Sequence, residues 1–184
     1  VGFGEVSQGY SNDKLMSKYY KYSTHARVLK DHPKIDWQIV IDTNIDSCKV
    51  AKEVWGVPKV FSSIEKAKTQ LQKIEILIIA TPPQIRTNLI EYFPSLKGII
   101  TEKPLGISYK DSNCFIEKCK QKNIKLQVNF WRRGDSFFMN LANGNLKYLL
   151  GNIQIAYCLY GNGLRNNGSH MIDTCRMLFG EIDR

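Results

Sequence analysis

The chain has 184 residues, enough for one complete domain and part of a second. Hydrophobic residues make up 43% of it, an ordinary share for a globular protein, and no apolar run reaches the roughly 18 residues that span a bilayer. The net charge of +9 comes mostly from lysines scattered over expected helix surfaces, without a dense basic block. We therefore predict a cytoplasmic protein that binds neither nucleic acid nor a membrane.

The sequence opens on a glycine cluster, with no initiator Met and no signal peptide. We expect the chain to begin inside a strand and to stop part-way through a second domain. The five cysteines are an odd number and include no C-x-x-C pair, which indicates neither a disulfide framework nor a zinc site. We predict no metal and expect the thiols to pack mostly as small apolar groups.

Strand-like and helix-like periods alternate through the first 130 residues. β-rich or apolar runs predict strands at residues 1–3, 36–42, 74–80, 98–101 and 125–130. Helical spacing or a capping signal predicts helices at 23–31, 45–55, from 62 onward, 84–92 and 109–121. This alternation is typical of an α/β fold in which crossover helices connect parallel strands.

The pattern changes after about residue 131. Residues 137–150 predict a helix broken near Asn143-Gly144, residues 152–160 alternate like a half-buried strand, and residues 170–179 predict a helix that stops at Gly180. These elements are too few to enclose a core. We predict a dinucleotide-binding domain over residues 1–130 and the incomplete start of a second domain over residues 131–184.

The first chemical signal is a glycine turn at residues 2–7, which follows the end of a strand. It matches the dinucleotide fingerprint G-x-G-x-x-G/A, except that Ser7 stands at the third small position. In that fingerprint the second glycine lets the backbone approach the pyrophosphate, and a helix N-terminus behind the turn attracts the phosphates. An ordinary glycine turn is the alternative. The cofactor contacts predicted here are Gly2, Gly4, Glu5, Val6 and Ser7.

An acidic residue ends the next predicted strand. A carboxylate at Asp42 can accept hydrogen bonds from the adenosine ribose hydroxyls and repels a 2′-phosphate, which favours NAD over NADP. Gly4 and Asp42 are 38 residues apart, whereas the usual gap is about 20. We attribute the excess to an insertion over residues 11–22, which is rich in polar residues and tyrosine.

A charged turn, Glu102-Lys103-Pro104, follows the strand predicted at residues 98–101. Ligands of open α/β sheets bind at the carboxyl ends of the strands, so Lys103 is expected to face the cofactor crevice. A lysine there can hydrogen-bond a substrate hydroxyl and stabilise developing negative charge. A surface lysine in a Pro-Gly turn is the alternative.

Together these segments resemble the glucose–fructose oxidoreductase, inositol dehydrogenase and MocA (Gfo/Idh/MocA) family of oxidoreductases. The resemblance covers essentially the whole chain and is carried by GFGEVSQGY, VID, ATPP, EKPLG and NNGSHMIDTCRMLFG. It implies a Rossmann-type α/β fold, a doubly wound parallel sheet, followed by the beginning of an α+β substrate domain. It also implies NAD as the cofactor, with NADP less favoured, and a homo-oligomer at full length.

The resemblance further implies roles for individual residues. Lys103 matches the active-site lysine, and His170 matches the general base that takes the proton of the substrate hydroxyl as hydride leaves the same carbon. Asn166 stands where many members carry Asp, and an amide can orient a hydroxyl but cannot take its proton. Asp173, on the same helix face as His170, is expected to contact sugar hydroxyls or to hold the histidine. Further predicted cofactor contacts are Thr81, Pro82, Glu102 and Lys103.

We therefore predict an oxidoreductase that transfers hydride between a nicotinamide cofactor and a hydroxyl or keto carbon of a sugar, nucleotide sugar or cyclitol. The alternative is a non-catalytic NAD-binding regulatory module of the same fold, which the departure at Asn166 favours. Arg86 replaces a histidine common in the family, and we expect it to contact phosphate or substrate or to lie exposed. Arg132 and Arg133 fit either an anionic sugar group or the protein surface.

Overall fold

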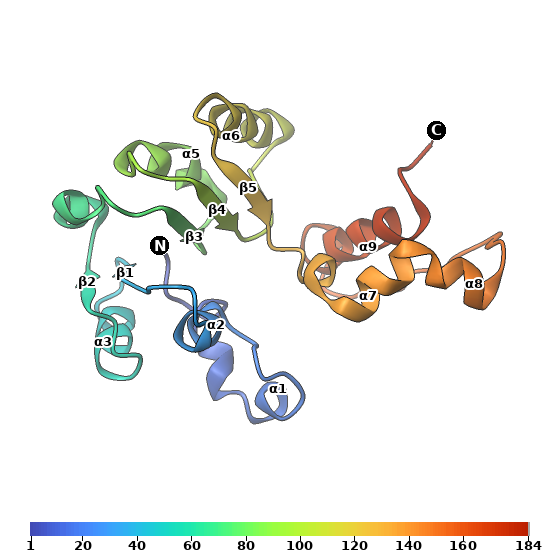
Figure 1. Ribbon diagram of the computed structural model, residues 1–184, viewed down its shortest axis with the longest axis horizontal. Coiled ribbons are helices and arrows are strands. Elements are labelled where there is room, and N and C mark those ends of the chain that lie inside the picture. The colour runs from blue at the N-terminus through green and yellow to red at the C-terminus, as the bar shows by residue number, and fades with distance from the viewer. Residues whose placement is uncertain (184) are drawn as a thin grey trace. The chain divides into compact units, whose positions relative to one another are not determined.

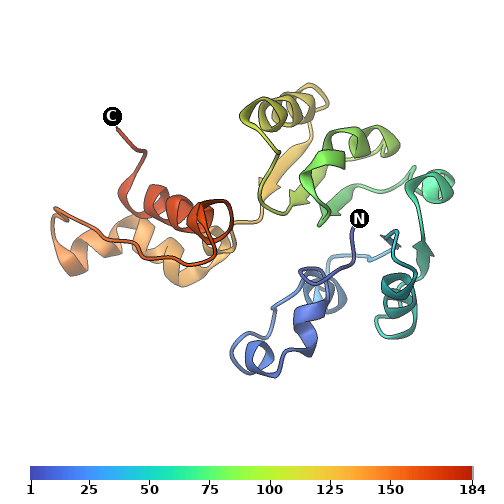
Figure 2. The ribbon, with the colours of Figure 1, turned by 180° about the vertical axis from the view of Figure 1, so that it is seen from behind.

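The computed structural model describes residues 1–183. Contacts within the chain divide it into two compact units, Val1–Gln127 and Val128–Arg184. Figures 1 and 2 show the first unit in blue to yellow and the second in orange and red. No helix in the described part of the chain is both long and apolar enough to cross a bilayer.

The first unit is built around short parallel strands. β1 pairs with β2, with Val40 opposite Val60, and β3 pairs with β4, with Leu77 opposite Ile99. β5 follows β4 at the edge of the second group. The bounds are β1 (Ile39–Ile41), β2 (Lys59–Phe61), β3 (Ile76–Ile79), β4 (Gly98–Thr101) and β5 (Lys125–Val128).

The N-terminal segment joins the two groups of strands into one layer. The nitrogen of Val1 donates to the Ile78 carbonyl at 2.7 Å, and the Ala80 amide donates to the Val1 carbonyl at 2.9 Å. On the other side, the Gly2 amide donates to the Ile41 carbonyl at 2.9 Å. The spatial order is therefore β2, β1, the N-terminal segment, β3, β4 and β5, with the N-terminus between β1 and β3 (Figure 1).

Helices alternate with the strands of this layer. Four of the helices that the sequence predicts begin where a side chain accepts a backbone N–H of the first turn, and these caps are Thr24, Asn44, Ser63 and Ser108. Such short polar side chains explain why the helices start where the sequence predicts. The bounds are α1 (Lys14–Tyr19), α2 (His25–Asp31), α3 (Ile45–Glu53), α4 (Ile64–Ala67), α5 (Arg86–Leu89) and α6 (Tyr109–Gln121).

Buried side chains lie on both faces of the layer. Neighbouring residues of a strand point to opposite faces, and on β1 Val40 belongs to a buried cluster that includes Trp55 of the segment after α3, whereas Ile41 belongs to a second cluster that includes Leu77 and Phe115 of α6. Residues of α2 and α3 therefore cover one face, and residues of α4, α5 and α6 cover the other. This is the doubly wound parallel α/β arrangement that the sequence predicts.

Some predicted elements differ in extent. The strand predicted at 36–42 is limited to β1. The sequence pattern predicts no strand at residues 59–61, where the structure has β2. The helix predicted at 84–92 is divided, because 3₁₀ turns at Pro83–Ile85 and Ile90–Tyr92 flank the single turn of α5. The insertion at 11–22 contains α1, whose first amides are capped by Asp13.

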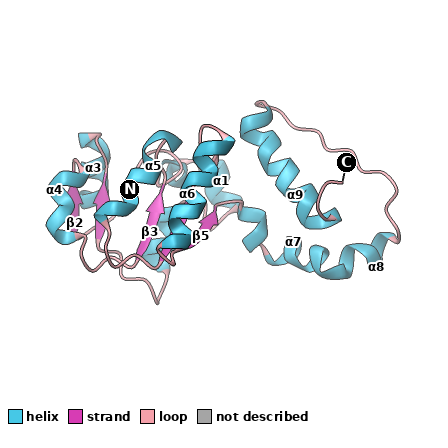
Figure 3. Cartoon of the chain, turned by 90° about the horizontal axis from the view of Figure 1, so that it is seen from above, coloured by secondary structure: helices cyan, strands magenta, loops and turns pink. Residues whose placement is uncertain are grey.

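After Val128, the last residue of β5, the described residues of the second unit form helices and loops, as Figure 3 shows. The predicted break is confirmed, because Asn143 and Gly144 leave helical geometry, Gly144 with a φ of +110°. The last helix ends at Gly180, where φ is +94°, also as predicted. The bounds are α7 (Ser136–Asn140), α8 (Leu146–Leu150) and α9 (Ser169–Phe179).

The strand predicted at residues 152–160 is wrong for this structure. The segment has no strand partner within residues 1–183 and is exposed throughout. The alternating apolar side chains Ile155, Tyr157 and Leu159 are 71%, 90% and 94% exposed. A strand is stable only when it pairs with a neighbour, so alternation in the sequence is not sufficient.

Candidate cofactor site and catalytic residues

The glycine turn begins with a residue that must be glycine. Gly2 has a φ of +83°, and a Cβ placed on it would lie 2.8 Å from the backbone carbonyl of Ala80. Ser7, at the third small position of the fingerprint, is buried, and its Oγ donates to the Gly2 carbonyl at 2.7 Å. The hydroxyl is thus satisfied within the turn, so Ser7 fits where glycine or alanine is usual.

The middle of the turn is open. A Cβ on Gly4 would meet no atom within 4 Å, and Gly4, Glu5 and Val6 are exposed. Within residues 1–183, the amides of Glu5 and Val6 have no hydrogen-bond acceptor. Backbone N–H groups that converge in an exposed turn can bind an anionic phosphate. The open space at Gly4 and these two amides therefore fit an anionic group such as a pyrophosphate.

The helix expected directly behind the turn is not formed. The Gln8 amide bonds to the Gly4 carbonyl at 3.0 Å and closes one helical turn, after which the chain enters the 3₁₀ helix Gly9–Asn12 and then α1. The insertion at 11–22 begins inside this 3₁₀ helix. The dipole of a long helix is consequently absent from the described turn, and the individual amides remain as phosphate donors.

Asp42 ties the end of β1 to the glycine turn. Its Oδ2 accepts from the Phe3 amide at 2.5 Å, and its Oδ1 accepts from the Asn44 amide at 2.7 Å. The side chain is half-buried. Each carboxylate oxygen has more than one lone pair, so Asp42 retains acceptor capacity for a ribose hydroxyl.

Thr81 and Pro82 follow β3. Pro82 is exposed, and Oγ1 of Thr81 is buried with no hydrogen-bond partner in the described chain. A buried hydroxyl without a partner costs free energy unless a ligand or water completes it. This orphaned hydroxyl beside the glycine turn is a second feature that fits a bound cofactor.

Arg86 is a buried charged residue in this region. The expectation that it lies exposed is wrong, because its side chain is buried, with 2% exposure, and its guanidinium donates to backbone carbonyls. Nε and Nη2 donate to the Thr81 carbonyl at 3.2 and 2.6 Å, and Nη1 donates to the carbonyls of Glu102 and Pro104. Burial lowers the pKa of Arg86, and the nearby charge of Glu102 opposes that shift.

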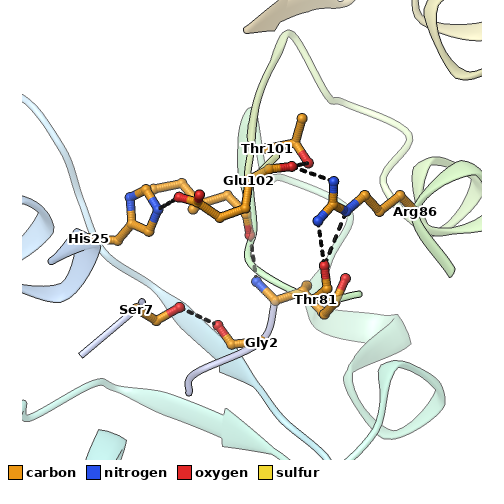
Figure 4. A network of polar contacts seen from close by, with 9 residues as sticks. Gly2, Ser7, His25, Thr81, Arg86, Thr101 and Glu102 are labelled. Atoms are coloured by element: carbon orange, nitrogen blue, oxygen red, sulfur yellow. Dashed lines mark hydrogen bonds and ion pairs between the residues drawn. The ribbon is translucent and has the colours of Figure 1, made fainter. Parts of the chain in front are cut away.

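The Glu102-Lys103-Pro104 turn follows β4 and is half-buried at Lys103. The carboxylate of Glu102 accepts a hydrogen bond from Nε2 of His25 at 2.7 Å (Figure 4). Their side chains are 14% and 16% exposed, so the pair is largely shielded from water. His25 is the first residue of α2, and the next residue, Ala26, donates its amide to the Ser7 carbonyl at 2.8 Å.

The first unit therefore brings together the cofactor residues that the sequence predicts. Asp42, the glycine turn, Thr81 and Glu102 follow neighbouring parallel segments and lie at one edge of the sheet, connected by the bonds described above. His25 and Arg86 belong to the same network (Figure 4) but were not predicted as parts of it. No group of three or more His, Cys, Asp or Glu side chains that could hold a metal occurs in residues 1–183.

The remaining predicted catalytic residues lie in the second unit. Asn166 is in the π-helical turn Leu164–Gly168 directly before α9, and His170 is in the first turn of α9. The His170 ring meets the Phe130 ring edge-on, with centroids 5.6 Å apart. Lys103 belongs to the first unit, whereas the Asn166–Asp173 segment belongs to the second.

Asp173 has a protein partner. Asp173 is 8% exposed, and its Oδ1 and Oδ2 accept from Nε of Arg133 at 2.8 and 3.0 Å. A buried carboxylate requires such compensation. Arg133 is thus held by Asp173, and Asp173 orders the segment around α9 through this pair.

The first unit matches a known protein family. The family described as "Oxidoreductase family, NAD-binding Rossmann fold" (GFO_IDH_MocA) matches residues 19–130, which is more than half of the chain. The protein belongs to this oxidoreductase family. The matched region includes Asp42, Thr81 and Lys103, whereas the glycine turn and the Asn166–Asp173 segment lie outside it.

Relatives of this Gfo/Idh/MocA protein agree with that assignment. An uncharacterized oxidoreductase of Streptococcus pneumoniae is 25% identical over 169 residues, which are 90% of this chain and 40% of the relative. The structure of scyllo-inositol dehydrogenase from Lactobacillus casei with NAD(H) and scyllo-inositol is 21% identical, with a TM-score of 0.69 over 85% of this chain and 52% of that one.

A further structure, an oxidoreductase from Agrobacterium radiobacter in complex with NAD⁺, L-tartaric acid and magnesium, is 17% identical, with a TM-score of 0.69 over 86% of this chain and 51% of that one. At these identities the two structures establish the shared fold. The chain spans about half the length of the relatives that it matches.

Proposed function

We propose that the protein is an NAD-dependent dehydrogenase that acts on a hydroxyl-bearing carbon of a sugar, a nucleotide sugar or a cyclitol. The observation that carries the proposal is the clustering of the open Gly4 turn, Asp42 and the Lys103 turn at the carboxyl ends of neighbouring segments of one sheet. Ligand sites of open α/β sheets lie at this edge.

The cofactor is held by the first unit. The amides of Glu5 and Val6 bind the pyrophosphate, Thr81 Oγ1 donates to the bound dinucleotide, and Asp42 accepts from the adenosine ribose hydroxyls. A carboxylate at this position repels a 2′-phosphate, so we expect NAD to bind more tightly than NADP. When bound, the nicotinamide supplies the hydride acceptor that no side chain of the protein provides.

Protein side chains transfer the proton and orient the substrate. The His170 imidazole takes the proton of the reacting hydroxyl while the hydride of the same carbon leaves, which converts the alcohol to a carbonyl. The Lys103 ammonium hydrogen-bonds the reacting oxygen and stabilises negative charge on it. Asn166 orients a neighbouring hydroxyl, and Asp173 holds the α9 segment through Arg133.

The test uses the full-length protein, NAD and a panel of sugars, nucleotide sugars and cyclitols, with NADH fluorescence as the readout. We expect Lys103→Met and His170→Ala to lower kcat by at least about a hundredfold, in line with the usual contribution of one acid–base group, and to leave the Kd for NAD nearly unchanged. The exposed residues Lys110 and His32 give matched controls, Lys110→Met and His32→Ala. Wild-type turnover in either site variant would refute the assignment.

Asn166 favours a second candidate function without catalysis, because an amide can neither accept a proton as a base nor carry a charge. It is a non-catalytic NAD-binding regulatory module. This function requires that the full-length protein binds NAD tightly and forms no NADH with any compound of the panel. Titration of NAD and NADP in the same experiment measures the cofactor preference of the protein, whether it is a dehydrogenase or a regulatory module.

A further inference from the structure

Arg86 occupies an unusual position for a charged residue. It is the first residue of α5, yet its side chain is 2% exposed. Burial of a charge is unfavourable unless hydrogen bonds or an opposite charge compensate it. Here the compensation comes from three main-chain carbonyls, which belong to the two turns that follow β3 and β4.

The two carbonyls held by Nη1 lie on either side of Lys103. One belongs to Glu102 and the other to Pro104, while Nε and Nη2 hold Thr81 in the turn after β3. A guanidinium is planar and presents five N–H donors in a fixed fork, so it can bind both turns at once. An ammonium group has three donors on one atom and cannot reproduce this geometry.

A second contact holds the same turn from the opposite direction. Nε2 of His25 donates to the Glu102 carboxylate at 2.7 Å, and α2, which His25 begins, is bonded to the glycine turn through Ala26 and Ser7. Glu102 is therefore held through its main chain by Arg86 and through its side chain by His25, as Figure 4 shows. The backbone around Lys103 is fixed relative to the glycine turn.

We propose that Arg86 and His25 are positioning residues, which fix the main chain on both sides of Lys103 and thereby set the position of its ammonium group over the cofactor site. This inference rests on the proposed function, in which Lys103 contacts the reacting oxygen. Neither residue touches the substrate. Their loss displaces Lys103, and a displacement of about 1 Å can reduce turnover about a hundredfold without an equal loss of binding.

The experiment compares Arg86→Lys, His25→Ala and His25→Gln in the full-length protein. Arg86→Lys keeps the charge and loses the fork, whereas His25→Gln keeps an N–H donor for Glu102. We expect kcat per NAD-binding site to fall about a hundredfold in Arg86→Lys and His25→Ala, with the Kd for NAD changed by less than about threefold, and to recover in His25→Gln. Arg27→Lys, on the exposed side of α2, is the matched control.

A measurement that does not depend on activity separates this inference from the proposed function. Lysines are reductively methylated with ¹³C, and the Lys103 resonance is assigned by its loss in Lys103→Arg. We expect that resonance to shift in Arg86→Lys and His25→Ala and to return toward the wild-type value in His25→Gln, whether or not the protein oxidises a sugar.

An unchanged Lys103 resonance with unchanged kcat per NAD-binding site in both Arg86→Lys and His25→Ala overturns the proposal. So does a loss of NAD affinity that equals the loss of kcat, because the two residues would then shape the cofactor site in general. If Arg86→Lys does not fold, the pair His25→Ala and His25→Gln decides the same question.

Discussion

At the scale of single residues, the two glycines of the fingerprint have different physical functions. Gly2 is required by the fold, because its φ is +83° and its α-carbon faces the Ala80 backbone. Gly4 has ordinary φ and open space in front of it, so the folded chain itself places no steric demand on it. Its absence of a side chain matters only for a ligand that approaches the turn.

This difference predicts opposite results for the two alanine variants. Gly2→Ala places a Cβ 2.8 Å from the Ala80 carbonyl and in a left-handed backbone conformation, which alone costs about 1–2 kcal/mol of stability. Gly4→Ala should leave the unfolding midpoint unchanged and raise the Kd for NAD by at least about tenfold, equivalent to ~1.4 kcal/mol of binding free energy. Chemical unfolding and NAD titration measure the two effects, and equal loss of stability in both variants would contradict this interpretation.

At the scale of an element, α6 shows how one helix serves the sheet and the site. Oγ of Ser108 accepts from the Asp111 amide at 3.1 Å and starts the helix just after the Lys103 turn. Its inner face is buried through Phe115 and Cys119, and burial raises the pKa of the Cys119 thiol. The helix therefore anchors the end of that turn to the core.

Truncation of the buried side should be far more damaging than truncation of the exposed side. Phe115→Ala removes a ring that is 1% exposed and leaves a cavity, at a cost of about 3–5 kcal/mol in the free energy of unfolding. Tyr109→Ala, on the same helix and 85% exposed, should change it by less than about 0.5 kcal/mol. Urea unfolding of both variants checks the prediction, and similar midpoints would exclude the described packing of α6.

At the scale of the whole molecule, the first unit buries apolar residues on both faces of its sheet, whereas the second leaves an alternating apolar segment exposed at residues 152–160. Exposed, alternating apolar side chains with unpaired backbone favour association with another strand. We propose that this segment pairs with further strands in the full-length protein and that the full-length protein is a homo-oligomer.

The 184-residue chain should accordingly self-associate at micromolar concentration, as seen by sedimentation velocity. Ile155→Lys combined with Leu159→Lys should reduce the association, because it puts two charges on the exposed apolar row. Leu15→Lys with Val54→Lys adds the same charge at exposed positions of the first unit and serves as the control. If both double variants associate equally, the 152–160 segment is not responsible.

Much of the first unit could be predicted from the sequence. The apolar run at 74–80, the GIIT strand and the capping residues Asn44, Ser63 and Ser108 carry local signals for elements that the structure contains. The clustering of Asp42 with the glycine turn could also be predicted, because parallel strands end at one edge of a sheet. These features depend on local periodicity and on the topology that follows from it.

Contacts between residues distant in the sequence were decided only by the tertiary structure. His25 and Glu102 are 77 residues apart and Arg86 and Pro104 are 18 apart, and no local pattern marks either pair. Whether residues 152–160 form a strand also depends on distant residues, because alternation specifies which side chains share a face but does not supply the neighbouring strand that a strand requires. The sequence by itself determined most of the segments that form the sheet and the residues that follow them at its edge, because periodicity and capping are local signals. Only three-dimensional packing decided that a buried arginine and a histidine hold the Lys103 turn, since such contacts depend on where distant segments meet.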